Sequence, residues 1–440
     1  MKKRMFRKAA PALLLIFLGG CTLYSEVDVT PLVLLPANIE RGVDLPSMVR
    51  KADYLRAMEM SAAIDERPRQ NAADLGALGS AYLAAGRYDD ARYRLRAALD
   101  LDPFRTTYAE IAWNLSQVEY MSNNFESSLE WANIARDRGL SIRQWHLEYL
   151  QSLVNVPVYR FSGDTSDALP FKFGRPDVPR ITLRVNRKRE VEGIIDSGAV
   201  LSIISQRLAS SLPVKRLGKS EGTFYGLLGE PIAVTFGLLE TLELGGIVLE
   251  NVPVAIMPDA KMKFLLSKRD KTQFHMDFLL GSNLLKEFRL ELDFDRGRAI
   301  FTRLSDRDRQ PALDQNLFFE GFRPHVRGAV NRRGWFMFIL DTGSEITFLN
   351  ESRLTNLPVA FFGAGSHTAM LQGLGGSMKR GGKLEDVEIG LDKWGGKFRT
   401  LPMYASEEKD QAVGIIGQNF LKNFNVVIDF GRMRVDLKRR

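Results

Sequence analysis

The spacing of apolar residues along the chain changes once, near residue 155. Between about residues 47 and 155, apolar and small residues recur at helical spacing. Beyond Leu153 the period becomes two: residues 180–186 alternate apolar and polar side chains, which is typical of a half-buried strand. Short runs of this kind, separated by glycine-containing turns, continue to the C-terminus. The pattern therefore predicts a helical part followed by an all-β part.

The β part contains one motif twice. An apolar run ends on an aspartate, and a small hydroxyl residue and a glycine follow it. The two copies are Gly193-Ile-Ile-Asp196-Ser197-Gly198-Ala199 and Phe338-Ile-Leu-Asp341-Thr342-Gly343-Ser344. A strand that stops on Asp and bends at Gly places a carboxylate on the floor of a turn. One such motif is an ordinary turn sequence, but two point to a repeated domain.

Each motif has the same companions further along the chain. An apolar-apolar-glycine segment ends at Gly281 in the first copy and at Gly417 in the second, and a strand pattern follows each. We therefore expect two equivalent domains, residues 165–303 and 316–440. Residues 304–315 between them are polar and contain Pro311, which predicts a linker.

Within the helical part, eight residues occupy the signature positions of a tetratricopeptide (TPR) repeat: Leu75, Leu78, Gly79, Tyr82, Ala91, Leu95, Ala98 and Pro103. The small residues let two antiparallel helices approach closely, and the larger ones fill the space between them. A second, degenerate unit follows between Leu115 and Ala135. We expect a TPR-like domain over residues 47–155, which either binds a protein partner or braces the β part.

The two β domains resemble the retroviral-type (retropepsin-like) aspartic proteases, and the resemblance covers about residues 165–440. It implies two acid protease barrels that form a pseudo-dimer, with Asp196 and Asp341 as the catalytic dyad of an aspartic-type endopeptidase. Two carboxylates that share one proton supply both a general base and a general acid for hydrolysis of a peptide or protein substrate. Ser197 and Thr342 would hydrogen-bond across to the opposite loop, and Gly198 and Gly343 would allow close approach of the backbone.

The residue after each of these glycines differs between the copies. Ala199 stands in the first copy and Ser344 in the second. A hydroxyl group at this position can stabilise an ionised carboxylate. We therefore expect Asp341 to hold the negative charge and Asp196 the proton.

Two glycine-rich segments are candidates for flaps over a bound substrate. Their glycines are Gly226, Gly229, Gly373, Gly375 and Gly376. Hairpin tips of this kind can hold an extended peptide by main-chain hydrogen bonds. Ordinary tight hairpins are the alternative interpretation.

The first residues resemble a bacterial lipoprotein signal. A basic stretch is followed by an apolar run and then by Cys21, the only cysteine. The resemblance implies a signal peptide at 1–20, a lipid on Cys21 and a tether at 21–46. Thr22 favours the outer membrane, so we expect a lipid-anchored protein of the bacterial envelope with its body in the periplasm.

Composition narrows the classes of function. The 440 residues are 45% hydrophobic and 26% charged, as in globular proteins. The net charge of +8 comes from basic residues interleaved with acids, so we expect no nucleic-acid partner. The four histidines are scattered, and neither His-Glu-x-x-His nor Gly-x-Ser-x-Gly occurs, so neither a metal nor another cofactor is expected.

Two alternatives to the single-chain enzyme remain open. The first is a catalytically weak or inactive lipoprotein that binds a peptide or protein through the TPR-like region and the cleft. The second is a homodimeric enzyme in which like domains of two chains pair.

Overall fold

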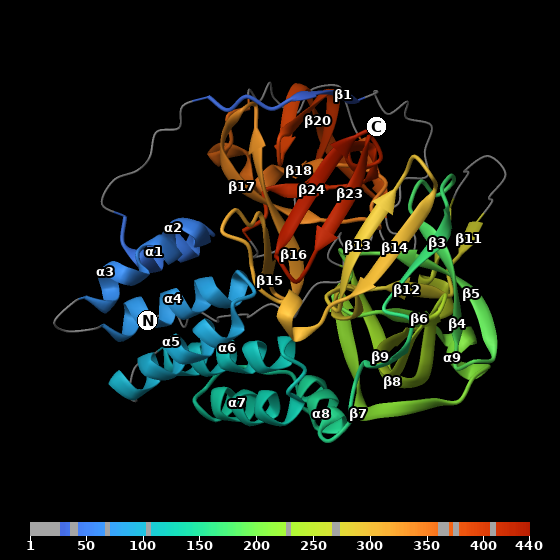
Figure 1. Ribbon diagram of the computed structural model, residues 1–440, viewed down its shortest axis with the longest axis horizontal. Coiled ribbons are helices and arrows are strands. Elements are labelled where there is room, and N and C mark those ends of the chain that lie inside the picture. Colours follow the sequence, from blue (N-terminus) through green and yellow to red (C-terminus); the bar gives the residue numbers. More distant parts are fainter. Residues whose placement is uncertain are drawn as a thin grey trace.

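A computed structural model describes residues 27–35, 43–66, 71–102, 107–225, 230–265, 273–359, 369–372, 378–404 and 411–440. Figure 1 shows a helical domain that packs along one side of two β lobes, with the first lobe in green and yellow and the second in orange and red. The predicted order, a helical part followed by two β lobes, is confirmed. The leader 1–20 and Cys21 lie outside the described residues.

The helical domain contains eight helices in the described part of the chain. They are α1 (Leu45–Arg50), α2 (Tyr54–Glu59), α3 (Ser61–Asp65), α4 (Ala72–Ala84), α5 (Tyr88–Leu101), α6 (Tyr108–Met121), α7 (Phe125–Asp137) and α8 (Gln144–Leu153). Helices α4 and α5 pack closely because Gly79 lies against Leu95: a Cβ atom on Gly79 would stand 2.6 Å from Leu95 Cγ. Such helix pairs fit the small-residue pattern of the sequence, whereas the TPR assignment itself stays a prediction.

The first lobe consists mainly of strands, with two short α-helices that both follow the Asp loop in the sequence. Its elements are β2 (Arg160–Gly163), β3 (Ser166–Lys172), β4 (Arg180–Val185), β5 (Arg189–Ile195), β6 (Ile203–Ser205), α9 (Gln206–Ser210), β7 (Val214–Tyr225), β8 (Pro231–Leu244), β9 (Ile247–Met257), η1 (Asp259–Lys261), β10 (Lys263–Leu265), β11 (Gln273–His275), β12 (Phe278–Leu280), α10 (Ser282–Leu285), β13 (Phe288–Asp293) and β14 (Arg298–Arg303).

The second lobe repeats most of this order, without counterparts of β2, η1, β10 and β11 among its described residues. It consists of β15 (Leu317–Glu320), β16 (Arg323–Val330), β17 (Arg333–Leu340), β18 (Phe348–Asn350), η3 (Glu351–Asn356), β19 (Ala369–Gln372), β20 (Met378–Leu391), β21 (Trp394–Tyr404), β22 (Gly414–Ile416), α11 (Gln418–Leu421), β23 (Phe424–Asp429) and β24 (Arg434–Arg439).

The pairing of strands around the Asp loops is the same in both lobes. The strand that leads to the aspartate, β5 or β17, pairs in parallel with β12 or β22. That partner pairs antiparallel with β6 or β18, which in turn runs parallel to β9 or β21. Parallel strands buried on both faces read as continuous apolar runs, which explains why each aspartate follows one.

One sheet joins the two lobes at their base. Strand β13 of the first lobe pairs antiparallel with β23 of the second, with Leu290 opposite Ile428 and Leu292 opposite Val426. The outer neighbours are β14 and β24, so the order β24-β23-β13-β14 crosses from one lobe to the other. Alternate residues of β13 and β23 are buried, and the sheet is therefore part of the shared core.

Three boundaries differ from the predicted ones. The predicted tether contains β1 (Val27–Pro31), which pairs antiparallel with β21 at the edge of the second lobe. Strand β2, just before residue 165, pairs with β9 and belongs to the first lobe. The predicted linker contains η2 (Asp306–Asp308), and Ala312 N–H donates to the Arg432 carbonyl at 2.8 Å. These segments are tied down by backbone hydrogen bonds that local sequence patterns do not reveal.

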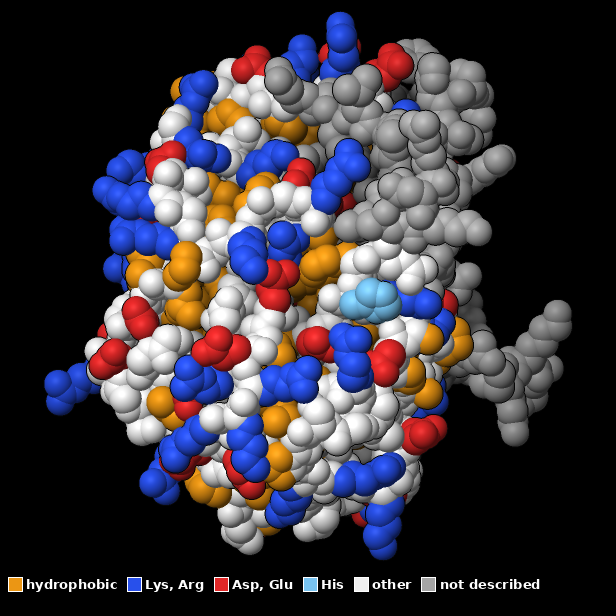
Figure 2. Space-filling view, turned by 90° about the vertical axis from the view of Figure 1, so that its right-hand side faces the viewer, with side chains coloured by type: hydrophobic (Ala, Val, Ile, Leu, Met, Phe, Trp, Pro, Cys, Tyr) orange, Lys and Arg blue, Asp and Glu red, His pale blue; other side chains and the backbone are white. Residues whose placement is uncertain are grey.

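Figure 2 shows the side on which β5, β11 and α9 lie: basic and acidic side chains are intermixed over its lower half, and basic ones predominate at its upper left. Ion pairs in this lobe include Arg184 with Glu190 at 2.8 Å and Arg207 with Asp277 at 2.9 Å. Within the described ranges, no helix has the length and apolar character needed to span a membrane.

Candidate active site

The two Asp loops begin where β5 and β17 end. Asp196 N–H donates to the Leu280 carbonyl at 3.0 Å, and Asp341 N–H donates to the Ile416 carbonyl at 3.1 Å. Each aspartate is therefore fixed to the last residue of the parallel neighbour strand. The same local sequence gives the same local geometry twice.

Four hydrogen bonds cross between the loops and involve both hydroxyl residues. Ser197 N–H donates to Thr342 Oγ1 at 3.0 Å, and Thr342 N–H donates to Ser197 Oγ at 3.0 Å. In return, Ser197 Oγ donates to the Leu340 carbonyl at 2.6 Å and Thr342 Oγ1 to the Ile195 carbonyl at 2.8 Å. Both side chains are fully buried, so this reciprocal set fixes the distance between the loops.

The glycines of the two motifs face the opposite carboxyl groups. A Cβ atom on Gly198 would lie 2.5 Å from Cγ of Asp341, and one on Gly343 would lie 2.5 Å from Cγ of Asp196. Carbon atoms never approach this closely without bonding, so only glycine fits at either position. The structure thus brings Asp196 and Asp341 together across the interface between the lobes.

In each carboxyl group, one of the two oxygens accepts a hydrogen bond from a backbone N–H and the other does not. Ala199 N–H donates to Asp196 Oδ1 at 3.1 Å, and Gly343 N–H donates to Asp341 Oδ1 at 2.9 Å. Apart from the proton that the two carboxyl groups share, the other oxygen, Oδ2, receives no hydrogen bond from the described residues in either aspartate. Two buried carboxyl oxygens are therefore left for a reactant.

Burial raises the pKa of both aspartates. It lifts the pKa of Asp196 well above its ordinary value, and the nearby Asp341 raises it further. Burial also raises the pKa of Asp341, to about 7, while hydrogen bonds from Gly343 N–H and from Asp196 act in the opposite direction. These effects favour a pair with a protonated Asp196 and a charged Asp341.

A protonated Asp196 and a charged Asp341 agree with the expectation from the sequence. The expected cause, a hydrogen bond from the Ser344 hydroxyl to the Asp341 carboxylate, is wrong. The Ser344 hydroxyl donates to the Ile346 carbonyl at 2.9 Å and does not contact the carboxylate. The cations nearby include Arg323 at the start of β16, whose charge lowers the pKa of Asp341. Nothing in the local sequence points to Arg323, because it enters the site from another strand.

The loops are supported from behind by residues that also recur in the repeat. Gly281 N–H donates to Ser202 Oγ, and Gly417 N–H donates to Thr347 Oγ1, both at 3.0 Å. Asn283 Oδ1 accepts from Ser202 N–H, and Asn419 Oδ1 accepts from Thr347 N–H, both at 2.7 Å. Sequence reasoning missed these four supporting side chains. The repeat could have revealed them. Ser202 and Thr347 stand at equal distances after the two aspartates, and Asn283 and Asn419 stand two residues after Gly281 and Gly417.

The five candidate flap glycines lie outside the described residues. The strands that flank them are antiparallel pairs: β7 and β8 pair up to Tyr225 and Pro231, and β19 and β20 pair up to Gln372 and Met378. The flap assignment therefore stays a prediction. In the described part of the chain, no group of three or more His, Cys, Asp or Glu side chains is placed to hold a metal ion.

A comparison with solved structures matches, among others, three crystal structures. The retropepsin-like aspartic protease from Rickettsia conorii is 18% identical, with a TM-score of 0.23, and the match covers 33% of this chain and 96% of that one. The aspartic proteinase from Irpex lacteus is 12% identical, with a TM-score of 0.33 and coverage of 62% and 97%. Basic 7S globulin from soybean is 11% identical, with a TM-score of 0.35 and coverage of 64% and 97%.

A comparison with curated proteins gives no match. Among protein families, residues 181–284 match the model described as aspartyl protease. This segment runs from β4 to α10 and contains the whole Asp196 loop. The resemblance predicted from the motifs is confirmed over this segment: residues 181–284 are similar to the aspartyl proteases.

Proposed function

We propose that this chain is an aspartic endopeptidase that hydrolyses peptide bonds in a cleft between its two β lobes. The observation that carries the proposal is the pair of buried carboxyl groups, which face each other with one unpartnered oxygen each among the described residues. The family match of the segment around Asp196 supports the same class of chemistry.

The two carboxyl groups have different parts in this reaction. The charged Asp341 accepts a proton from a water molecule, whose oxygen attacks the carbonyl carbon of the substrate. The protonated Asp196 donates to the carbonyl oxygen as the tetrahedral intermediate forms. Asp341 then gives the proton it took from water to the leaving nitrogen, and the carbon–nitrogen bond breaks. One hydroxyl group of the intermediate returns its proton to Asp196 as it becomes the carbonyl of the new carboxyl group, which restores the starting state of the pair. Burial of both carboxyl groups makes a singly charged pair more stable than a doubly charged one.

The dyad is completed within one chain in this proposal. Ser197 and Thr342 belong to the same polypeptide, and so do the paired strands β13 and β23. A dimer of two chains is not needed to bring two aspartates together. The expected mass in solution is therefore that of a monomer, which size-exclusion chromatography with light scattering measures.

We further propose that the enzyme works at the bacterial cell envelope, anchored by a lipid on Cys21 and with its body in the periplasm. The sequence of the leader supports this placement. Its substrate would be a peptide or protein of that compartment, and the TPR-like region would offer a second surface for a protein partner. Metabolic labelling with a fatty acid, compared between the natural chain and a Cys21→Ala variant, tests the anchor.

The test of the activity uses the chain from Thr22 onward and the variants Asp196→Asn and Asp341→Asn. Each is incubated with a mixed peptide library from pH 3 to 8, and the products are identified by mass spectrometry. Cleavage by the natural sequence that is lost in both variants supports the proposal. A folded protein that cleaves nothing at any pH would instead favour the peptide-binding alternative.

A further inference from the structure

A cavity lies at the base of the two lobes, between the sheet that joins them and residues 304–312. It measures about 410 Å³ and is open to solvent. Its walls belong to both lobes, because β13 and β14 come from the first lobe and the turn between β23 and β24 comes from the second (Figure 1). Small-molecule sites in proteins usually enclose about 300–1,000 Å³, so this cavity has room for a ligand.

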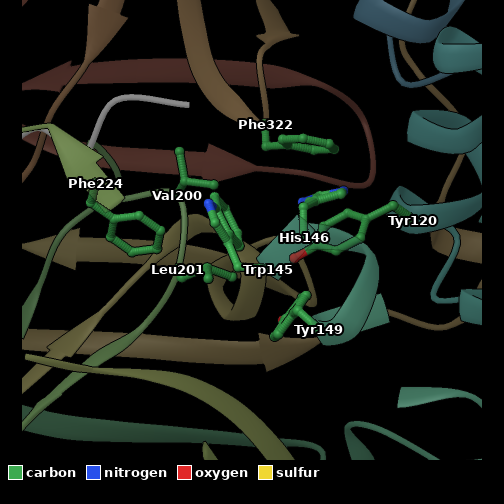
Figure 3. A pocket seen from close by; sticks show the side chains of 8 residues that line it. All are labelled: Tyr120, Trp145, His146, Tyr149, Val200, Leu201, Phe224 and Phe322. Atoms are coloured by element: carbon green, nitrogen blue, oxygen red, sulfur yellow. The ribbon is translucent and has the colours of Figure 1, made fainter. Parts of the chain in front are cut away.

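The space between the helical domain and the Asp196 loop is filled by comparison. Figure 3 shows aromatic side chains of α6, α8 and β7 that converge there, with Val200 and Leu201 beside them. About 20 Å³ remains between these side chains, which is room for about one water molecule. This contact fixes the helical domain to the lobes and leaves no space for a ligand.

Four arginines line the cavity at the base, and each comes from a different element. They are Arg289 of β13, Arg303 of β14, Arg307 of η2 and Arg432 of the turn after β23. Arg289 lies 3.9 Å from Asp429, whereas the other three form no ion pair within the described part of the chain. Because Asp308 and Asp429 also line the cavity, its wall carries a net charge of +2. A cavity with this charge attracts anions.

The two aspartates of the wall are engaged by their own turns. Asp308 accepts hydrogen bonds from the N–H and the hydroxyl of Ser305, at 2.8 and 2.6 Å. Asp429 accepts from the N–H groups of Gly431 and Arg432, at 3.0 and 2.9 Å. These bonds hold both carboxylates against the backbone, so neither bridges the three unpaired arginines.

The repeat contains a second copy of the turn after β23, and there the positive charge is neutralised by the chain itself. The turn Asp293-Phe-Asp-Arg296 after β13 corresponds to Asp429-Phe-Gly-Arg432 after β23. In the first copy, Arg296 lies 3.4 Å from Asp293, and Asp295 accepts a hydrogen bond from Arg440 at 3.1 Å. In the second copy, Gly431 stands in place of Asp295, and a side chain there would overlap the Asp308 carbonyl. The cavity therefore lies beside the copy that has lost this carboxylate.

The walls of the cavity are fixed by hydrogen bonds of the backbone. Leu304 N–H donates to the Glu287 carbonyl at 3.0 Å, and Ala312 N–H donates to the Arg432 carbonyl at 2.8 Å. The segment between the lobes is thus tied to the first lobe at one end and to the second lobe at the other. A preformed site loses little conformational freedom when it binds a ligand.

We propose that this cavity binds an anion with two neighbouring phosphate groups, held by Arg303, Arg307 and Arg432. Guanidinium groups bind phosphate oxygens through paired, charge-assisted hydrogen bonds. A single phosphate group carries about two negative charges at neutral pH, so three arginines match two phosphate groups better than one. Soluble diphosphates and the headgroups at a lipid surface both present this chemistry. The bound anion contacts both lobes and the segment between them, and it therefore stabilises their association.

Titration calorimetry with inorganic pyrophosphate tests the site. The chain from Thr22 onward is compared with Arg307→Ala, Arg432→Ala and the double variant at constant ionic strength. Both arginines are exposed and form no ion pair among the described residues, so the variants should fold. We expect each single change to weaken the binding of pyrophosphate about tenfold, because it removes a hydrogen-bonded charge. Pyrophosphate should also raise the melting temperature of the natural chain and leave that of the double variant unchanged.

Arg96→Ala in α5 is the matched control. Arg96 is likewise exposed and forms no ion pair in the described part of the chain, but it does not line the cavity. This change should leave the affinity for pyrophosphate unaltered. Equal losses of affinity in Arg96→Ala and in the cavity variants would show that pyrophosphate responds to overall charge, which would overturn the site.

Cosedimentation with lipid vesicles separates the two sources of phosphate. If a headgroup is the ligand, the natural chain binds phosphatidylglycerol vesicles but not phosphatidylcholine vesicles, and both pyrophosphate and the double variant abolish the binding. Binding of pyrophosphate without binding of vesicles assigns the cavity to a soluble diphosphate. A folded chain that binds neither pyrophosphate nor vesicles contradicts the proposal. Peptide cleavage does not enter these measurements, so their outcome is independent of the endopeptidase.

Discussion

Replacing Thr342 with valine tests the four hydrogen bonds by which Ser197 and Thr342 connect the two Asp loops. The change removes one hydroxyl group and keeps the shape of the side chain. In the structure this hydroxyl accepts from Ser197 N–H at 3.0 Å and donates to the Ile195 carbonyl at 2.8 Å. Both partners are fully buried, so water cannot replace the lost bonds.

The loss of stability follows from the two groups that lose their partner, Ser197 N–H and the Ile195 carbonyl. A buried donor or acceptor without a partner costs about 1–3 kcal/mol. We therefore expect Thr342→Val to lower the free energy of unfolding by at least about 2 kcal/mol. Thr342→Ser is the matched control, because it keeps the hydroxyl and loses one methyl group, which is worth about 1 kcal/mol.

The same change should affect catalysis more than stability. The four hydrogen bonds between the loops set the separation of Asp196 and Asp341. A displacement of about 1 Å in an active site can lower the rate about 100-fold. Urea unfolding followed by tryptophan fluorescence gives the first quantity, and cleavage of a peptide found in the library gives the second. Ser197→Ala removes two different bonds, the one from Thr342 N–H and the one to the Leu340 carbonyl, so it should add a further loss of stability to that of Thr342→Val. Serine and valine variants of equal stability and activity would refute the reasoning.

Three other outcomes follow from the site. Because burial raises the pKa of Asp341 from 3.8 to about 7, its protonated form stabilises the native state below pH 4, and this advantage is lost as the pH rises through 7. The natural chain should therefore lose about 3 kcal/mol of unfolding free energy relative to Asp341→Asn between pH 4 and 7, whereas parallel urea-derived curves would contradict the raised pKa. Gly343→Ala should abolish cleavage while the far-ultraviolet circular dichroism stays native-like, because the new methyl group overlaps the Asp196 carboxyl. Ser344→Ala should leave the acid limb of the pH–rate profile unchanged, since its hydroxyl serves the Ile346 carbonyl; a shifted limb would restore the role first inferred from the sequence.

The dyad and its immediate supports were accessible to sequence reasoning because they are local and occur twice. An apolar run that ends in Asp and a glycine defines a strand and its turn, whichever protein contains it. Because the motif occurs twice in one chain, the simplest interpretation of the sequence is a site that contains both aspartates. The positions of Ser197 and Thr342 follow from the same motif.

Other features depend on contacts between distant segments. The direction of the Ser344 hydroxyl is decided by the torsions of its loop, which bring the Ile346 carbonyl within 2.9 Å. Arg323 acts on Asp341 from another strand, and it stands in no pattern that a single sequence reveals. The pairing of β1 with β21 likewise joins residues more than 350 positions apart. No local preference encodes such a pairing.

The sheet at the base of the lobes is symmetric about its own centre. Glu291 and Val427, which lie opposite each other, each stand three positions after the first residue of β13 or β23. On either side of this pair, Leu290 lies opposite Ile428 and Leu292 opposite Val426. Leu290 and Val426 hold the same position in their strands, and so do Leu292 and Ile428, as expected when two identical strands meet on a twofold axis. Two copies of one lobe could form the same strand pair, so the molecule has the architecture expected of a duplicated and fused homodimer. Fusion removes the requirement that both halves be identical. The two motifs already differ in this way, because Ala199 stands in the first lobe where Ser344 stands in the second.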